Sequence, residues 1–262
     1  MNAVGALVAR DYRITRSYRL AFVLDLLYGV VEVAIYYFIS KTFAATPSAA
    51  LGGAPSYFAF ATVGIIITLV VASASNGVAQ RLREEQLAGT LEALTMQPVR
   101  TMELAIGLAG FPCVFAFFRA ATYVFFATAF FGLEFHGSVP GLVVVLLATA
   151  TAMLGLGILV AAVTVLFKRG GTFASAAIFG MGVFSGAVFP VSVLPGWLQS
   201  VARLLPTKFA LNGTRHAMFG AGGWSGDALA LFAFGAVTVP IAILLFHRAL
   251  EGARRAGTLA QY

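Results

Sequence analysis

The chain has 262 residues, of which 60% are hydrophobic and 10% charged, and its formal net charge is +7. Soluble domains are usually about 45–50% apolar and about 25% charged, so this composition excludes an ordinary soluble protein and indicates an integral membrane protein. The single cysteine, Cys113, excludes a disulfide within the chain and a thiolate metal cluster.

Six apolar windows are long enough to cross a membrane, because a spanning helix needs about 20 consecutive apolar residues. They are residues 20–43, 57–78, 104–131, 142–167, 172–189 and 228–246. Windows of this length exclude a transmembrane barrel, whose strands alternate in polarity over about ten residues. Little chain remains for a separate soluble domain, so the sequence predicts one all-α integral membrane domain over residues 1–262.

Basic residues predict the orientation, because they are retained on the cytoplasmic side of a membrane. One set of flanks holds most of the arginines, whereas the opposite set holds only Lys41, Arg203, Lys208 and Arg215. We therefore expect a multi-pass protein of the plasma (inner) membrane with both termini in the cytoplasm. The net positive charge follows from this asymmetry and favours contact with anionic membrane lipids, and it does not indicate a nucleic-acid surface.

Residues 1–19 precede the first span and predict an amphipathic helix. Most of the apolar residues share one arc of a helical wheel, and Arg10, Arg13 and Arg16 take the opposite arc. This pattern is typical of an interfacial helix along the inner leaflet, with its apolar side toward the lipid and its arginines toward the headgroups. A basic tail that only sets the topology is the alternative.

The first span carries a polar stripe, since Asp25, Tyr28, Glu32 and Tyr36 recur at helical spacing on one face. An ionised carboxylate at mid-membrane costs at least about 2.5 kcal/mol, so it needs a partner, water or a proton. Arg119 is the only basic residue deep in any span, and we predict an ion pair between Glu32 and Arg119. Asp25 lies near the inner headgroups and can extend toward them. The stripe either lines a substrate pathway or holds helices together.

Residues 81–98 form a densely charged stretch between the second and third spans. The pattern predicts that the second span continues as a charged helix to Gln86, that Gly89 breaks it, that Thr90 caps a short helix and that Pro98 ends it. The short helix has an apolar edge with carboxylates nearby, formed by Leu87, Leu91, Leu94, Glu84, Glu85 and Glu92. Such a helix can insert into a groove on a soluble partner. A solvated turn between two spans is the alternative.

Residues 190–226 lie between the fifth and sixth spans and are too apolar for an ordinary loop. Pro190, Pro195 and Pro206 divide the segment into pieces of about ten residues, each too short to span a membrane. We expect short external or re-entrant helices that dip into the outer leaflet or lie at its surface, with Trp197 at the headgroup level.

Two stretches resemble the signatures of the type-2 permeases of ATP-binding-cassette exporters, the ABC-2 family. Residues 83–99, REEQLAGTLEALTMQPV, are similar to the family pattern E-R-E-x-G-T-L-E-x-L-x-x-x-P-V. Residues 185–220 are similar to the second pattern, in which a run of small residues precedes Phe189 and Pro190, then Pro195, Pro206 and Arg215. Six spans and an amphipathic N-terminal helix also agree, so the resemblance covers essentially the whole chain.

The resemblance implies a permease subunit whose residues 83–98 act as a coupling helix on a separate cytoplasmic ATPase, with two permeases and two ATPases per complex. The contact residues that it implies are Glu84, Glu85, Gly89, Thr90, Leu91, Glu92, Leu94 and Pro98. No G-x-x-x-x-G-K-[ST] phosphate loop occurs in the sequence, so we expect the partner to bind ATP and Mg²⁺, and this chain to hold no cofactor or metal.

We therefore expect a transport protein, not an enzyme, that exports an amphipathic or glycan-bearing molecule (a drug, a lipid or a polysaccharide) between two copies of the permease. The alternative is a proton-coupled secondary transporter that uses Asp25, Glu32 and Arg119. An intramembrane enzyme is disfavoured, because the scattered histidines form no H-E-x-x-H motif and no serine lies in a G-x-S-x-G motif.

Overall fold

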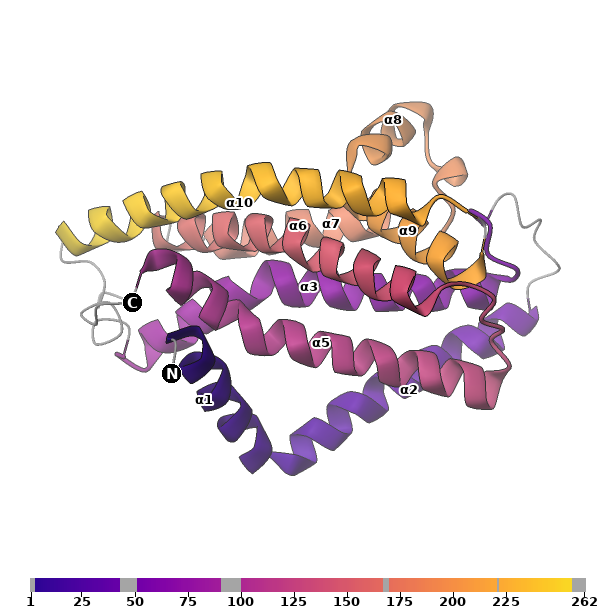
Figure 1. Cartoon of the computed structure of the whole chain (residues 1–262), viewed down its shortest axis with the longest axis horizontal. Helices are drawn as coiled ribbons and strands as arrows, with labels where there is room; N and C mark the ends of the chain where they lie inside the picture. The colour runs from indigo at the N-terminus through magenta and orange to yellow at the C-terminus, as the bar shows by residue number, and fades with distance from the viewer. Residues whose placement is uncertain (1–2, 43–50, 91–99, 167–169, 221, 256–262) are drawn as a thin grey trace.

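The computed structural model describes residues 3–42, 51–90, 100–166, 170–220 and 222–255. All regular structure in these residues is helical, as the composition predicts, and the long helices run along one another as a bundle (Figure 1). The elements are α1 (Ala3–Ser17), α2 (Arg19–Thr42), α3 (Tyr57–Leu87), α5 (Thr101–Phe131), α6 (Val139–Leu166), α7 (Gly170–Phe184), the 3₁₀ helix η1 (Val191–Val193), α8 (Gly196–Leu204), α9 (Pro206–Phe219) and α10 (Trp224–Arg255).

Five helices in the described part of the chain are long and apolar enough to cross a membrane, namely α2, α3, α5, α6 and α10. The fifth predicted span corresponds to α7, which has only 15 residues. At 1.5 Å per residue it rises about 22 Å, less than the roughly 30 Å of a hydrocarbon core. The helix ends at Phe184 and not at residue 189, because Gly186 has a φ of 93° that a helix does not accommodate.

The core of the bundle is built around α3 and α6. In α3, 78% of the most apolar stretch is buried, against 11% in α2 and 22% in α10. Glycines let α6 approach both neighbours closely: a Cβ at Gly157 would clash with the backbone of α3, and one at Gly155 would clash with Thr238 of α10. The outer helices α2 and α10 therefore keep most of their apolar surface for lipid or for another protein.

The direction of α7 follows from what packs at the two ends of α6. Toward the C-terminal end of α6, Ile158 lies in a buried cluster with Leu82 of α3 and Phe246 of α10. Near its N-terminal end, Val145 lies against Gly213 of α9. The chain thus leaves one end of the bundle after α6 and reaches the other end at α9, and α7 carries it back. The beginning of α1 and the end of α10 lie at the same end of the bundle (Figure 1).

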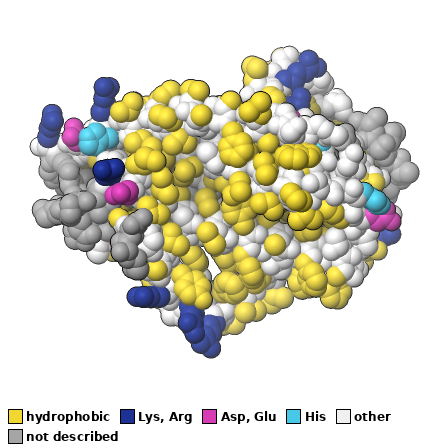
Figure 2. Space-filling model, viewed as in Figure 1, with side chains coloured by type: hydrophobic (Ala, Val, Ile, Leu, Met, Phe, Trp, Pro, Cys, Tyr) yellow, Lys and Arg dark blue, Asp and Glu magenta, His cyan; other side chains and the backbone are white. Residues whose placement is uncertain are grey.

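Apolar and charged side chains occupy different parts of the surface. On the face shown in Figure 2, hydrophobic side chains cover the middle of the bundle, and charged side chains gather toward its ends and at the corner between α1 and α2. The exposed apolar residues include Leu27, Val31 and Phe38 of α2, and Leu244 of α10. An apolar band between charged ends suits a bilayer, whose apolar core lies between two polar headgroup regions.

Candidate functional site

An ion-pair cluster joins α1 to the last turns of α3. Asp11 is fully buried; its Oδ1 accepts hydrogen bonds from Nε and Nη2 of Arg10 at 3.1 and 3.0 Å, and its Oδ2 lies 3.6 Å from Nε of Arg81. Nη1 of Arg10 lies 2.7 Å from Oε1 of Glu85, and Nη1 of Arg81 lies 2.8 Å from Oε2 of Glu84. These five residues, named the α1–α3 cluster below, tie the N-terminal helix to the segment predicted to contact an ATPase.

Within the α1–α3 cluster, Arg10 is held in its charged form. Its partial burial acts to lower its pKa, but Asp11 and Glu85 act in the opposite direction, and the pKa of Arg10 is raised from its ordinary value. Only 12% of the Glu85 side chain is exposed, against 48% for Glu84. Of the two glutamates that the resemblance assigns to an ATPase contact, Glu85 therefore lies largely inside this chain, and Glu84 remains accessible.

Apolar packing holds α1 in place beside this cluster. Leu7 is buried against Gly107 of α5, and Val8 lies against Gly110, where a larger residue would clash. The α1 segment is helical as predicted, but part of its apolar arc faces α5. The predicted orientation of this arc toward lipid is thus wrong for Leu7 and Val8, because Gly107 and Gly110 of α5 let these side chains pack closely against that helix. The sequence pattern of α1 alone does not show this contact.

The end of α3 matches the predicted break. The helix continues to Leu87, and Gly89 then adopts a φ of 69°. The hydroxyl of Thr90, predicted as an N-cap, donates a hydrogen bond to the backbone oxygen of Glu85 at 3.3 Å and also bonds the Glu85 carboxylate. The remaining residues of the predicted coupling helix, Leu91, Glu92, Leu94 and Pro98, lie outside the described residues, so that helix stays a prediction.

A second polar cluster lies within the spans. Nη1 of Arg119 lies 3.0 Å from Oδ2 of Asp25, and Nε and Nη2 of Arg119 donate hydrogen bonds to the Tyr123 hydroxyl at 3.0 and 2.9 Å. The predicted pairing of Arg119 with Glu32 is wrong, as is the expectation that Asp25 simply extends toward the headgroups. Counting residues from the span ends assumed parallel helices, whereas α2 slants across the bundle (Figure 1), and it is Asp25 that lies in contact with Arg119.

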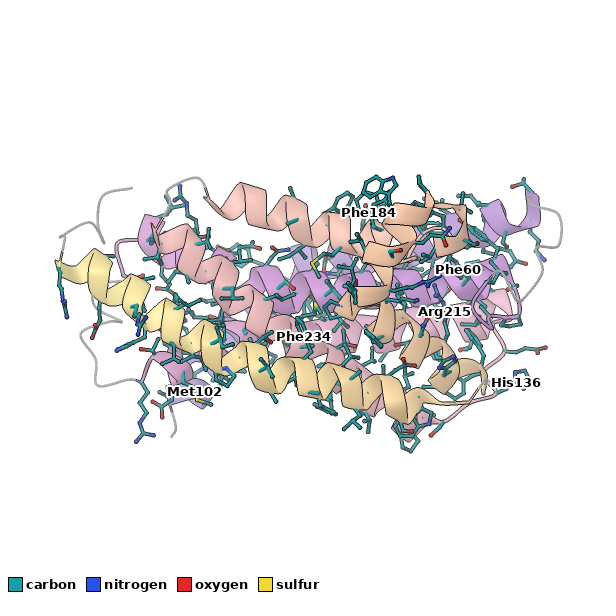
Figure 3. All side chains as sticks on the ribbon, turned by 90° about the horizontal axis from the view of Figure 1, so that it is seen from above. Phe60, Met102, His136, Phe184, Arg215 and Phe234 are labelled. Carbon is teal, nitrogen blue, oxygen red and sulfur yellow. The ribbon has the colours of Figure 1, made fainter. Side chains whose placement is uncertain are left out.

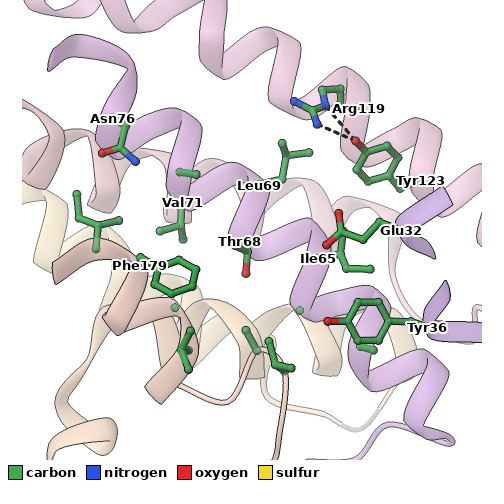
Figure 4. A pocket seen from close by; sticks show the side chains of 18 residues that line it. Glu32, Tyr36, Ile65, Thr68, Leu69, Val71, Asn76, Arg119, Tyr123 and Phe179 are labelled. Carbon is green, nitrogen blue, oxygen red and sulfur yellow. Dashed lines mark hydrogen bonds between the residues drawn. The ribbon is translucent and has the colours of Figure 1, made fainter. Parts of the chain in front are cut away.

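Glu32 and Tyr36 line a cavity of about 410 Å³ between α2, α3, α5 and α7. In Figure 4 the Glu32 side chain lies near Arg119 and Tyr123, and Asn76 lies farther along α3. Most of the remaining lining is apolar and includes Ile65, Leu69, Val71, Ile178 and Phe179. Tyr28, the other residue of the predicted stripe, is 70% exposed. The stripe therefore divides into an ion-paired residue, two cavity residues and one exposed residue.

A second hollow of about 470 Å³ continues toward the α1–α3 cluster. It shares Asn76 and Arg119 with the first cavity, and its lining extends to Arg81 and Glu84. The two hollows thus follow α3 from its charged end to Glu32. Pockets that combine an apolar wall with a few polar groups are typical of sites for amphipathic molecules.

The segment after α7 has the predicted proline breaks. Pro190 precedes η1, Pro195 precedes α8, and Pro206 occupies the first turn of α9. Trp197 is 70% exposed on α8, which stands off the bundle (Figure 1), and Phe189 is half-buried. The prolines thus divide the segment into η1, α8 and α9, and the predicted position of these helices at the outer leaflet stays a prediction.

Arg215 of this segment is buried, although the signature pattern gives no sign of it. It is 4% exposed, and its guanidinium carbon lies 4.0 Å from the ring centroid of Phe60. Its Nη2 donates a hydrogen bond to the backbone oxygen of Gly186 at 2.8 Å, and Figure 3 shows Arg215 and Phe60 side by side. Next to it in the sequence, Nδ1 of His216 lies 3.1 Å from Oδ2 of Asp227 on α10.

Sequence reasoning missed several members of these clusters. It did not single out Asp11 or Arg81 as partners of the coupling region, and it overlooked Tyr123. Signals were present, because Asp11 is the only acidic residue before the first span and Tyr123 follows Arg119 by four residues, one helical turn. Their meaning depends on which helices pack together, and a single sequence does not give that.

The comparisons with known proteins agree with the two signatures. None of the curated proteins matches the sequence. The family model for the ABC-2 type transporter matches residues 6–219, a range that runs from α1 to α9 and includes both the charged end of α3 and the proline-rich segment. This match covers most of the chain. The chain therefore belongs to the ABC-2 type transporter family.

Proposed function

We propose that this chain is the permease subunit of an ABC exporter, driven by a separate cytoplasmic ATPase that docks on residues 83–98. Family membership supports this proposal, because ABC-2 permeases are membrane components that normally work with an ABC ATPase. The sequence has no phosphate loop, so ATP binding by that route falls to a partner. The alternative of proton-coupled transport gains no support from the family match.

The α1–α3 cluster is the observation that carries the proposal beyond family membership. It includes Glu84 and Glu85 at the beginning of the predicted docking segment, and its ion pairs cross from α3 to α1 through Arg10, Asp11, Arg81 and Glu85. A displacement of the end of α3 would therefore move α1 with it. Since α2 begins two residues after α1 ends, the displacement would reach the wall of the Glu32 cavity. Coupling requires that the nucleotide states of the ATPase prefer different permease conformations.

In the proposed topology the chain crosses the membrane six times, with α7 as the short crossing and both termini in the cytoplasm. The return path of α7 along α6 supports it, as does the common end at which α1 begins and α10 ends. We further propose that two copies associate and that an amphipathic substrate passes between them. The largely unburied α2, beside the Glu32 cavity, supports this arrangement.

The docking assignment is tested by isolating the tagged permease from its native membrane. We expect vanadate-sensitive ATP hydrolysis to co-purify with the wild-type chain, and to be lost with Leu91→Asp and with Glu92→Lys. Both variants should still insert into the membrane and elute normally in size-exclusion chromatography. Glu134→Gln removes an exposed carboxylate after α5, at the opposite end of the bundle, and should keep the ATPase. Wild-type levels of co-purified hydrolysis in both docking variants would contradict the assignment.

A further inference from the structure

The buried Arg215 has no anionic partner in the described residues. Its one hydrogen bond there is the Nη2 bond to the Gly186 backbone oxygen, its Nε has no partner, and its guanidinium faces the Phe60 ring. A carbonyl oxygen and an aromatic face each interact with a cation, but neither supplies a full negative charge. A buried charge normally requires an ionic partner, because its removal from water costs several kcal/mol.

None of the carboxylates in the described part of the chain is the missing partner. The sequence has 10 acidic residues, and all except Glu92 lie in the described ranges, where none forms an ion pair with Arg215. The neighbouring Asp227 bonds His216. Burial lowers the pKa of Arg215 to about 10, so the side chain stays charged at neutral pH.

A cavity of about 200 Å³ adjoins Arg215. Its lining adds a second cation, Lys208, the amide of Asn212 and the hydroxyls of Ser185 and Ser192. Lys208 and Asn212 come from α9, Ser185 follows α7 and Ser192 lies in η1. The Ser185 hydroxyl donates to the Gly182 backbone oxygen at 2.8 Å, so the donors that face a ligand are those of Lys208, Asn212 and Ser192. A water molecule occupies about 30 Å³ in the liquid, so the space admits a tetrahedral oxyanion together with some water.

We propose that this cavity, the Arg215 pocket, binds a phosphate group, with Arg215 and Lys208 as the paired cations and Asn212 as a further donor. The phosphate is that of a free phosphorylated solute or of an anionic phospholipid headgroup, which present the same chemistry to the site. An arginine fork suits phosphate oxygens, and a lysine adds a point charge. The pocket goes beyond the transport function proposed above and does not depend on ATPase docking.

Thermal unfolding of the purified permease tests the pocket, because a ligand that binds the folded state raises Tm. Reaction of the single cysteine, Cys113, with a thiol-reactive fluorophore reports unfolding. One arm titrates inorganic phosphate into protein in phosphatidylcholine nanodiscs, with chloride keeping the ionic strength constant. The other arm replaces part of the phosphatidylcholine with phosphatidylglycerol. We expect Tm to rise in at least one arm.

Two matched variants separate the pocket from general charge effects. Lys208→Gln should weaken the apparent affinity about tenfold, the effect of one charge-assisted hydrogen bond. Arg203→Gln removes an exposed charge from neighbouring α8, outside the pocket, and should leave the affinity within about twofold. Arg215 is buried, so a substitution there also tests folding. The test therefore uses Lys208→Gln, which removes the second cation of the pocket and keeps Arg215.

Each outcome decides for or against the site. A Tm rise with inorganic phosphate that Lys208→Gln weakens supports a site for phosphorylated solutes, and one seen only with phosphatidylglycerol supports a headgroup site. The proposal is overturned if neither arm raises Tm. It is also overturned if Lys208→Gln leaves the rise unchanged, or if the two variants reduce it equally.

Discussion

Two buried charges at opposite ends of α3 have opposite surroundings. Asp11 is 0% exposed and lies between Arg10 and Arg81. Arg215 is 4% exposed, and among the described residues its partners are the Gly186 carbonyl oxygen and the ring of Phe60, with no carboxylate. A buried charge with its partners present contributes to structure, and removing one partner is costly. A buried charge that lacks a partner instead points to a component from outside the chain. We therefore assign Asp11 to the structural contact between α1 and α3, and Arg215 to a candidate binding site.

The largest effect is expected when the Asp11 charge is removed. Asp11→Asn keeps the shape of the side chain but leaves Arg10 and Arg81 without their shared carboxylate, so we expect a loss of about 3 kcal/mol in the free energy of unfolding. Reversible denaturation in lipid-containing detergent measures it. A loss below about 0.5 kcal/mol, the range of surface substitutions, would show that the buried pair is not structural.

An intermediate effect is expected within the spans. A double-mutant cycle between Asp25→Asn and Arg119→Gln should give a coupling energy of about 1–2 kcal/mol, because the charges lie in direct contact. The cycle between Glu32→Gln and Arg119→Gln should give less than about 0.5 kcal/mol, since Arg119 is already neutralised by Asp25. Equal coupling energies in the two cycles would show that Glu32 pairs with Arg119 as strongly as Asp25 does.

The smallest change is expected at Arg215 without added anion. Arg215→Met removes the hydrogen bond to Gly186, but it also removes the cost of burying an unpaired cation, so the free energy of unfolding should stay within about 1 kcal/mol of the wild type. The measurement is made in phosphate-free buffer and neutral lipid. A loss of unfolding free energy as large as that of Asp11→Asn would show that Arg215 is a structural residue. Asp11 and Arg215 would then no longer have different roles.

The sequence predicted best what depends on local pattern. Five of the six apolar windows, the break at Gly89 and the prolines before the short helices follow from residue order alone, and the described structure has them. The N-terminal helix was also predicted, because its apolar and basic arcs repeat at helical spacing. Two local signatures were sufficient to indicate the family that the family model then matched.

Features that depend on helix packing were not predictable from one sequence. The slant of α2 decides whether Asp25 or Glu32 meets Arg119, and the glycines of α5 that Leu7 and Val8 contact decide which side of α1 is buried. The burial of Arg215 likewise results from contacts with Phe60 and Gly186, residues far away in the sequence. In each case the partner lies on another element of the fold, and sequence spacing does not record how the elements are placed relative to one another.

The central claim is that α1 and the end of α3 move as one unit when the ATPase changes state. Spin labels are attached in pairs at three exposed positions, Arg13→Cys, Gln80→Cys and Arg255→Cys, in a Cys113→Ser background. Double electron–electron resonance then measures the distances between the labels in nucleotide-free and in vanadate-trapped complexes. The account predicts that the 13–80 distance stays constant while the 13–255 distance changes, and that adding Glu85→Gln and Arg10→Gln broadens the 13–80 distribution. A 13–80 distance that changes with nucleotide as much as the 13–255 distance would contradict it.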